Sequence, residues 1–93
     1  MTERIRAGVV GVGSMGRHHA RVYRELPGVE LVGVADLDRD RAAEVAAEFD
    51  TRVRDQAALL SAADAVSVVV PTRHHEAVAR AAIDADTHLL VEK

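Results

Sequence analysis

Three glycines and one aspartate have the spacing of a site that binds phosphate and ribose. Gly11, Gly13 and Gly16 form a G-x-G-x-x-G pattern, and Asp36 follows twenty residues after the last of them. The first glycine of such a turn lets the chain leave a strand sharply, and the second lets the backbone approach a pyrophosphate. The third lets a helix pack close to the strand. The pattern predicts a dinucleotide site, and the alternative is a glycine-rich turn without a ligand.

The ligand of such a turn is contacted by the first turn of the next helix and by the acidic residue. Unpaired N–H groups near Ser14 and Met15 would face the phosphates, and the helix dipole would add a favourable field. Asp36 would accept hydrogen bonds from the adenosine ribose. Because a carboxylate repels a 2′-phosphate, the sequence favours NAD over NADP. Arg39 and Arg41 lie close enough in sequence to leave NADP open.

Lys93 could support proton chemistry. It is a lysine in a chain whose other eleven basic Lys and Arg residues are arginine. The ammonium group of lysine is compact and its pKa falls on burial, which suits a hydrogen bond to a reacting hydroxyl and to a nicotinamide ribose. A single lysine can equally be chance.

The histidines do not have the spacing of a metal site. They occur as His18-His19, His74-His75 and His88. Neighbours on a helix point about 100° apart, there is no cysteine, and no HExxH pattern occurs. We therefore expect no metal. His75, near the end of a predicted strand, either contacts the ligand or begins a helix.

Two strands and a helix must hold the glycine turn and the acidic residue. Residues 5–10 and 31–35 form apolar runs typical of buried strands, and residues 15–26 have helical periodicity. The apolar face expected for this helix consists of Met15, His19, Val22, Tyr23 and Leu26. Arginines on the opposite face form a basic stripe, either a solvated surface or a contact for an anionic partner; they are Arg17, Arg21 and Arg24.

The rest of the chain continues the alternation of strands and helices. Asp38 or Asp36 can cap a helix over 39–49, and Asp55 can begin a short helix over 56–60. We expect strands at 51–53, 65–70 and 88–91, and a helix from about 74 to 85. This order predicts an α/β fold: a Rossmann-type doubly wound parallel sheet with strand order 3-2-1-4-5 in three layers.

Parallel strands bring the candidate residues to one edge of that sheet. The glycine turn, Asp36, Pro71-Thr72 and Glu92-Lys93 each follow a predicted strand. Ligands of doubly wound sheets bind outside the carboxyl ends of the strands. Thr72 can cap the following helix, contact the cofactor, or do both.

Taken together, these motifs resemble the N-terminal domain of the glucose–fructose oxidoreductase/inositol dehydrogenase/rhizopine-catabolism (Gfo/Idh/MocA) family. Pro71 and His75 match its Pro-x-x-x-His signature, and Glu92-Lys93 match the start of its Glu-Lys-Pro tripeptide. The resemblance implies an NAD(P)-dependent enzyme acting on a carbon–oxygen centre of a sugar, cyclitol or sugar nucleotide. It implies that Lys93 is catalytic. The cofactor-binding residues it implies, together with the turn, are Gly11, Gly13, Ser14, Met15, Gly16, Asp36, Pro71, Thr72, His75 and Glu92.

The family's second domain, with its substrate pocket and oligomer interface, does not correspond to any part of this sequence. We therefore expect residues 1–93 to form an NAD(P)-binding Rossmann domain without its substrate domain, and to be inactive alone. The whole protein is expected to be an oxidoreductase, with a homo-oligomer conceivable. Alternatives are a stand-alone NAD(H)-binding or sensing module and a Rossmann domain serving another nucleotide chemistry. Glu92-Lys93 favours the oxidoreductase over both of these alternatives.

Composition excludes several other classes of function. The net charge of −3 and the aromatic content of 2% argue against a nucleic-acid-binding surface. Without cysteine, a disulfide framework is excluded. No apolar run approaches the roughly 20 residues of a membrane span, and no signal-peptide pattern opens the chain. The expectation is a cytoplasmic protein with a small-molecule substrate.

Overall fold

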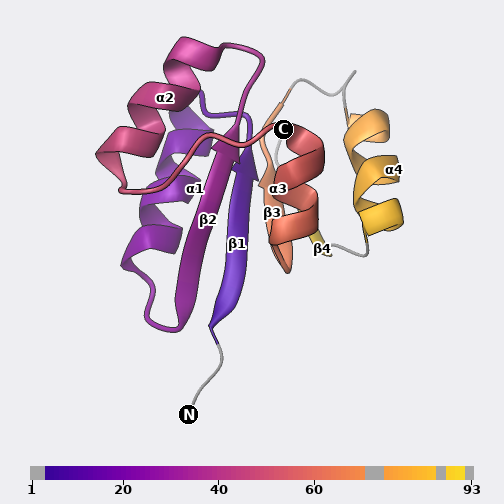
Figure 1. The fold of residues 1–93 in the computed structure, drawn as a ribbon, viewed down its shortest axis with the longest axis horizontal. Helices are drawn as coiled ribbons and strands as arrows, with labels where there is room; N and C mark the ends of the chain where they lie inside the picture. Colours follow the sequence, from indigo (N-terminus) through magenta and orange to yellow (C-terminus); the bar gives the residue numbers. More distant parts are fainter. Residues whose placement is uncertain (1–3, 71–74, 86–87, 92–93) are drawn as a thin grey trace.

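The computed structural model describes residues 4–70, 75–85 and 88–91. Strands and helices alternate along most of this part of the chain (Figure 1). The elements are β1 (Ile5–Val10), α1 (Ser14–Glu25), β2 (Val29–Ala35), α2 (Arg39–Glu48), α3 (Gln56–Ala62), β3 (Ala65–Val68), α4 (His75–Ala85) and β4 (His88–Val91).

The strands form one parallel sheet in the order β2-β1-β3-β4. The glycine turn and Asp36 follow β1 and β2, which are adjacent, so the predicted meeting of these two segments at the carboxyl edge is confirmed. The α/β fold with a parallel sheet is also confirmed. The segment predicted as a strand at 51–53 makes a single parallel bridge, Val34 to Val53, beside β2.

The exact bounds of the elements differ slightly from the predicted ones. Strand β2 begins at residue 29 rather than 31, and β3 ends at 68 rather than 70. Helix α2 ends one residue before the predicted limit, and α3 continues to residue 62. Helix α4 begins at His75; His74 lies outside the described residues.

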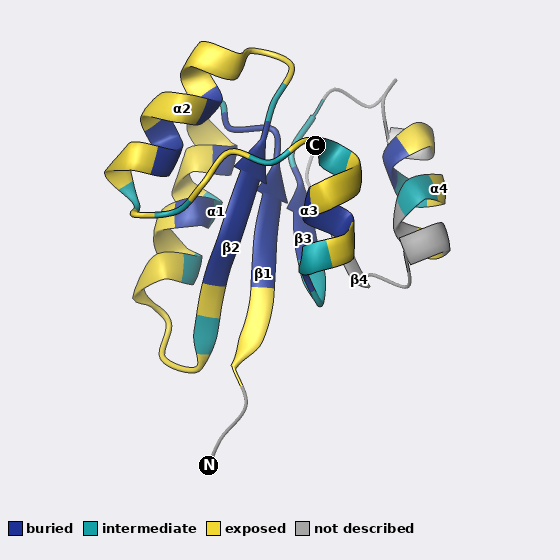
Figure 2. Ribbon diagram, viewed as in Figure 1, coloured by how far each residue is buried: buried dark blue, intermediate teal, exposed yellow. Residues whose placement is uncertain are grey.

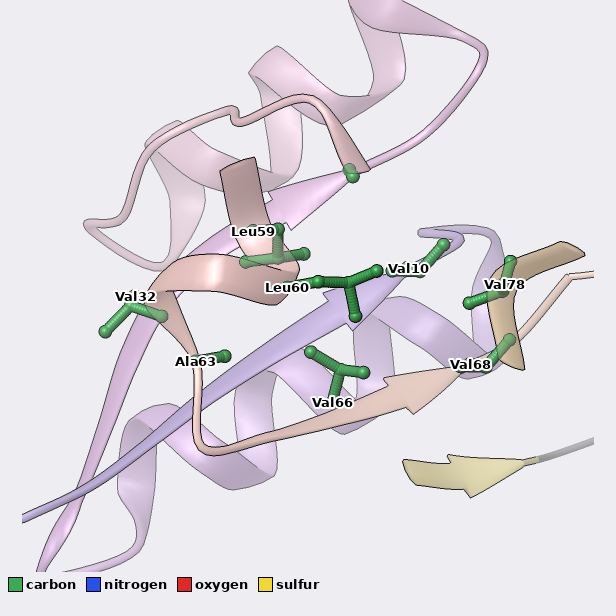
Figure 3. Packing of buried hydrophobic residues seen from close by; sticks show 9 residues of the cluster. Val10, Val32, Leu59, Leu60, Ala63, Val66, Val68 and Val78 are labelled. Atoms are coloured by element: carbon green, nitrogen blue, oxygen red, sulfur yellow. The ribbon is translucent and has the colours of Figure 1, made fainter. Parts of the chain in front are cut away.

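Two apolar cores cover the two faces of the sheet, because successive strand residues point to opposite sides. Val9 of β1 and Val34 of β2 pack with α1 and α2, whereas Val10 packs with α3 and α4. Figure 2 shows the buried residues concentrated on the sheet and on the inward sides of the helices. In Figure 3, Leu59 and Leu60 of α3 point toward the strands, in the core that contains Val10.

Helix α1 contacts the sheet through small residues, so the apolar face predicted from its periodicity is only partly correct. Its buried residues are Gly16 and Ala20. Met15, Val22 and Leu26 are 50%, 36% and 44% exposed, respectively. Because Gly16 brings the helix axis close to β1, the small side chains occupy the contact and the larger ones lie to its side. His19 and Tyr23, from the predicted face, are half-buried.

A fully buried serine links α1 to the middle of the sheet. Ser67 of β3 is 0% exposed and lies among valines. Its Oγ is 2.8 Å from His19 Nδ1 and also hydrogen-bonds the hydroxyl of Tyr23. The two rings meet edge to face, with centroids 6.4 Å apart. This contact fixes the helix that follows the glycine turn against the third strand of the sheet.

Replacing Ser67 with alanine is expected to lower the free energy of unfolding by about 1–3 kcal/mol, because two ring-bearing side chains lose a buried hydrogen-bond partner. For a domain of this size, each kcal/mol corresponds to a shift of roughly 4–8 °C in Tm. Thermal unfolding followed by circular dichroism measures this. Tyr23→Phe should have a smaller effect, since Ser67 keeps its contact with His19. If Ser67→Ala has the melting temperature of the wild type, the contacts of Ser67 with His19 and Tyr23 do not stabilise the fold.

An irregularity in β2 gives residues 51–54, which run beside this strand, a place to bind. The pairing of β1 with β2 shifts between Ala7 and Gly8, which leaves Val32 out of register. The carbonyl of Val32 accepts a hydrogen bond from Arg54 Nε at 2.8 Å. A Cβ on Gly33 would lie 2.9 Å from the Arg54 side chain, so the glycine makes room for this arginine. Thr51 Oγ1 donates to the Leu31 carbonyl at 2.8 Å.

Candidate functional site

The glycine turn is built by two glycines that no other residue could replace without a clash. Gly11 has a φ of +94°, and a Cβ there would lie 2.3 Å from the Val69 carbonyl oxygen. Its N–H donates to the Ala35 carbonyl at 2.8 Å, which joins the turn to the end of β2. A Cβ on Gly16 would lie 1.7 Å from the Gly11 carbonyl oxygen. The helix therefore begins in direct contact with the turn.

Gly13 differs from these two glycines because space is open beside it. A Cβ at this position would have one neighbour within 4 Å, the Nη1 atom of Arg41 at 3.8 Å. The φ of Gly13 is −67°, which any residue adopts. Its lack of a side chain is therefore not required by the fold of the described residues. A ligand approaching the backbone is a physical reason for a glycine here.

The N-terminus of α1 offers its backbone donors to a ligand. Helix α2 is capped by Asp38, whose carboxylate accepts from Arg41 N–H at 3.1 Å, and α3 by Asp55, which accepts from Ala58 N–H at 2.8 Å. Helix α1 begins after Gly13, with no side-chain cap and no acidic residue in its first turn. The first N–H groups of a helix need partners and attract anions. Ser14 and Met15, both exposed, begin this helix.

Asp36 is fixed by two backbone hydrogen bonds. Its Oδ2 accepts from Val12 N–H at 2.8 Å, inside the glycine turn, and its Oδ1 accepts from Asp38 N–H at 2.8 Å. The sequence predicted this carboxylate as a ribose acceptor but not as a support of the turn. An ionised carboxylate has about four acceptor sites, so each oxygen can still accept a further hydrogen bond. Half-burial leaves the group accessible.

A cavity of about 300 Å³ lies beside Asp36 at the carboxyl edge of the sheet. Its walls are mainly apolar, and Leu37 on its rim is 92% exposed. The size is at the lower end of small-molecule sites, which combine apolar walls with a few polar groups. The sequence does not predict this wall; its one signal is the leucine that directly follows Asp36. The other apolar residues lining the cavity are Val10, Ala35, Val53, Val70, Ala77 and Val78.

On the other side of the glycine turn, Arg17 of α1 is paired with Glu48 of α2. Its Nε and Nη2 atoms lie 3.0 and 2.6 Å from Glu48 Oε1. The hydrogen bond to Glu48, and then the charge of the same carboxylate, raise the pKa of Arg17 above its already high ordinary value. This guanidinium stays charged and is engaged by a carboxylate. The other arginines of the basic stripe, Arg21 and Arg24, are exposed.

Several predicted site residues cannot be compared with the structure. Pro71, Thr72, Glu92 and Lys93 lie outside the described residues. His75 is the first residue of α4, as in the reading that has it begin a helix. The strands leading toward these residues are placed: β3 and β4 pair in parallel, and Val68 faces Val91 at the last register position.

Two features are absent from the described part of the chain. Among residues 4–70, 75–85 and 88–91, no group of three or more His, Asp or Glu side chains is arranged to hold a metal ion. Within the same ranges, no helix has both the length and the apolar character needed to cross a membrane.

The sequence and the fold of this chain are similar to those of known dehydrogenases. UDP-N-acetylglucosamine 3-dehydrogenase from Acidithiobacillus ferrooxidans is 49% identical over 90 residues, which are 96% of this chain and 28% of that protein. Its crystal structure matches with a TM-score of 0.91, at 48% identity, over 97% of this chain and 30% of that one. Inositol 2-dehydrogenase 1 from Saccharopolyspora erythraea is 40% identical over 95 residues, 96% of this chain and 28% of that protein.

A structure with bound cofactor is also among the relatives. Myo-inositol dehydrogenase from Lactobacillus casei, in complex with NAD(H) and myo-inositol, matches with a TM-score of 0.86 at 34% identity. The match covers 97% of this chain and 28% of that one. The chain thus spans somewhat over a quarter of the length of these relatives. A sequence profile of the oxidoreductase family with an NAD-binding Rossmann fold matches residues 5–93, and the chain belongs to this Gfo/Idh/MocA family.

Proposed function

We propose that this chain is the cofactor-binding part of an NAD-dependent oxidoreductase. The whole protein would transfer a hydride between nicotinamide and a carbon–oxygen centre of a sugar, cyclitol or sugar nucleotide. The observation that carries the proposal is the position of Asp36: its carboxylate bonds the Val12 N–H at 2.8 Å and lines the adjacent cavity. A ribose acceptor and a phosphate-binding helix N-terminus are thereby held next to each other.

The described residues fit NAD. Gly13 leaves space beside the first turn of α1, where the N–H groups lack a side-chain cap and can donate to the pyrophosphate. Asp36 would accept from the adenosine ribose and repel a 2′-phosphate. The cavity beside Leu37 would take the adenine. When bound, the nicotinamide ring supplies the hydride acceptor or donor.

The residues at the ends of the later strands complete the proposal. Pro71, Thr72, His75 and Glu92 would line the cofactor, and Lys93 would be the catalytic residue, as in the family that the chain resembles. The Lys93 ammonium would hydrogen-bond the substrate hydroxyl and the nicotinamide ribose, and would assist the proton that accompanies the hydride. Substitution of Lys93 by alanine in a protein with its substrate domain should therefore lower kcat strongly while NAD affinity changes little.

The organisation of the whole protein is part of the proposal. Residues 1–93 would be an NAD(P)-binding Rossmann domain, with residues 51–53 completing the order 3-2-1-4-5 in three layers. A separate substrate domain would supply the substrate pocket and the oligomer contacts. The chain alone, in the cytoplasm, would bind cofactor without turning over substrate. The similarity to a sugar-nucleotide dehydrogenase, at 49% identity, favours a sugar nucleotide as the first substrate class to assay.

Binding of NADH to the 93-residue chain tests the proposal. Titration calorimetry or nicotinamide fluorescence should detect saturable binding, and Gly13→Val should abolish it because the side chain would occupy the space for the pyrophosphate. Gly13→Val should remain folded, with a melting temperature lowered by no more than about 10 °C, because a Cβ at this position would meet little protein and the main cost is a weaker N-terminal cap. Failure of the folded wild-type chain to bind NADH would overturn the proposal. Binding without turnover by a protein that has its substrate domain would favour the sensing module.

A further inference from the structure

Arg41 is an arginine of α2 that reaches the glycine turn. Its Nη1 atom lies 3.8 Å from the position that a Cβ of Gly13 would occupy. Arg41, Gly13 and Ser14 line one hollow on this side of the turn. The second glycine of this pattern marks the point where the pyrophosphate approaches the backbone. The guanidinium is therefore placed beside the expected position of the phosphates, rather than beside the ribose at Asp36.

Asp38 holds the Arg41 side chain only loosely, in a hollow that Glu44 and Glu48 also line. Its backbone N–H is bonded by the capping carboxylate of Asp38, while its Nη2 atom is 3.7 Å from that carboxylate, a long contact. The Arg41 side chain is 50% exposed. Arg17, the other arginine lining this hollow, is held by Glu48 at hydrogen-bond distances. Of these two cations, Arg41 has the weaker hold on a carboxylate.

We propose that Arg41 is a cofactor-binding residue that contacts the pyrophosphate of NAD, adding a mobile cation to the backbone donors of α1. This inference rests on the proposed function. Arginine suits the role because its planar fork donates two parallel hydrogen bonds to phosphate oxygens. Asp38 then both caps α2 and holds the arginine near the turn until phosphate replaces it as the partner.

The test compares ligands that carry different parts of the cofactor. Arg41→Gln should weaken binding of NADH and of ADP about tenfold, equivalent to ~1.4 kcal/mol, and leave binding of adenosine unchanged. Arg41→Lys should retain part of the affinity, because it keeps the charge without the fork. Arg21→Gln is the matched control: it removes the same charge from an exposed position on α1 and should bind ADP nearly as the wild type does. Kd values are measured calorimetrically at one ionic strength, after circular dichroism shows equal melting.

The outcomes separate this inference from the proposed function. Equal ADP affinity of Arg41→Gln and wild type would overturn the role of Arg41 and leave NAD binding intact. A loss of affinity confined to NADPH would place Arg41 at the 2′-phosphate and would also overturn its role at the pyrophosphate. An equal loss of ADP affinity in Arg21→Gln would show that the effect comes from the net charge of the protein and not from the position of Arg41, which would overturn the inference. If the wild type binds neither NADH nor ADP, the proposed function itself is wrong.

Discussion

Replacing Gly16 with alanine is expected to destabilise the protein by at least about 3 kcal/mol, although alanine is the better helix former. On an exposed helix the same change stabilises by about 1 kcal/mol. Here the new Cβ would lie 1.7 Å from the Gly11 carbonyl oxygen, a backbone atom that cannot move without displacing the turn. Forced contacts of this kind belong to the most damaging class of core substitutions. Urea unfolding followed by circular dichroism gives the free energy.

Gly13→Ala is the matched control for this experiment. The two glycines are three residues apart in the same motif, but a Cβ on Gly13 would have its nearest contact at 3.8 Å. Its stability should stay within about 1 kcal/mol of the wild type, the cost of a weaker N-terminal cap. If Gly16→Ala unfolds at the wild-type urea concentration, the close packing of α1 on the turn is not the reason for that glycine.

Substitution of Asp36 by asparagine should weaken cofactor binding and change the preference between NADH and NADPH. The present carboxylate accepts from two backbone N–H groups. Asparagine has one acceptor oxygen, and its NH₂ group would face an N–H donor of Val12 or Asp38. With the charged ribose acceptor lost as well, NADH affinity is expected to fall about 10–100-fold, on the scale of 1.5–3 kcal/mol for a hydrogen bond to a charged group. NADPH affinity should fall less, because the repulsion of the 2′-phosphate is removed.

Calorimetric titration of both cofactors measures this shift. Asp40→Asn serves as the control, because it removes the same charge from an exposed position in the first turn of α2. It should leave the ratio of NADH to NADPH affinity unchanged. An unchanged ratio in Asp36→Asn would show that another group discriminates between the two cofactors, and would weaken the assignment of Asp36 to the ribose.

The glycine turn and the capping residues could be predicted because their physical requirements are local. A positive φ at Gly11 and a capping carboxylate at Asp55 each depend on a few neighbouring residues. The packing face of α1 is harder to predict, because periodicity indicates the apolar side of a helix but not the distance of the helix from the sheet. Met15 is therefore half-exposed although it lies on the predicted face.

The parts of the candidate site that the sequence does not predict depend on contacts between distant segments. The bond from Val12 to Asp36 joins residues 24 positions apart, and its donor is a backbone group that carries no sequence signal. The approach of Arg41 to Gly13 depends on where the fold places α2 relative to the turn. The sequence predicts Val53 and Val70 as strand residues, but their convergence on the cavity beside Asp36 depends on the three-dimensional path of the chain.

Residues 51–54, which run beside β2, also protect the sheet from association with other molecules. An open edge strand offers unpaired N–H and C=O groups to a strand of a neighbouring chain, which is a common route to aggregation. Here Arg52 and Arg54 exchange backbone hydrogen bonds with Val34, and side chains from Thr51 and Arg54 occupy two further carbonyls of β2. A charged side chain at a bulge combines two of the devices by which natural sheets block such pairing. Residues 51–54 therefore shield one border of the sheet from intermolecular β-sheet growth.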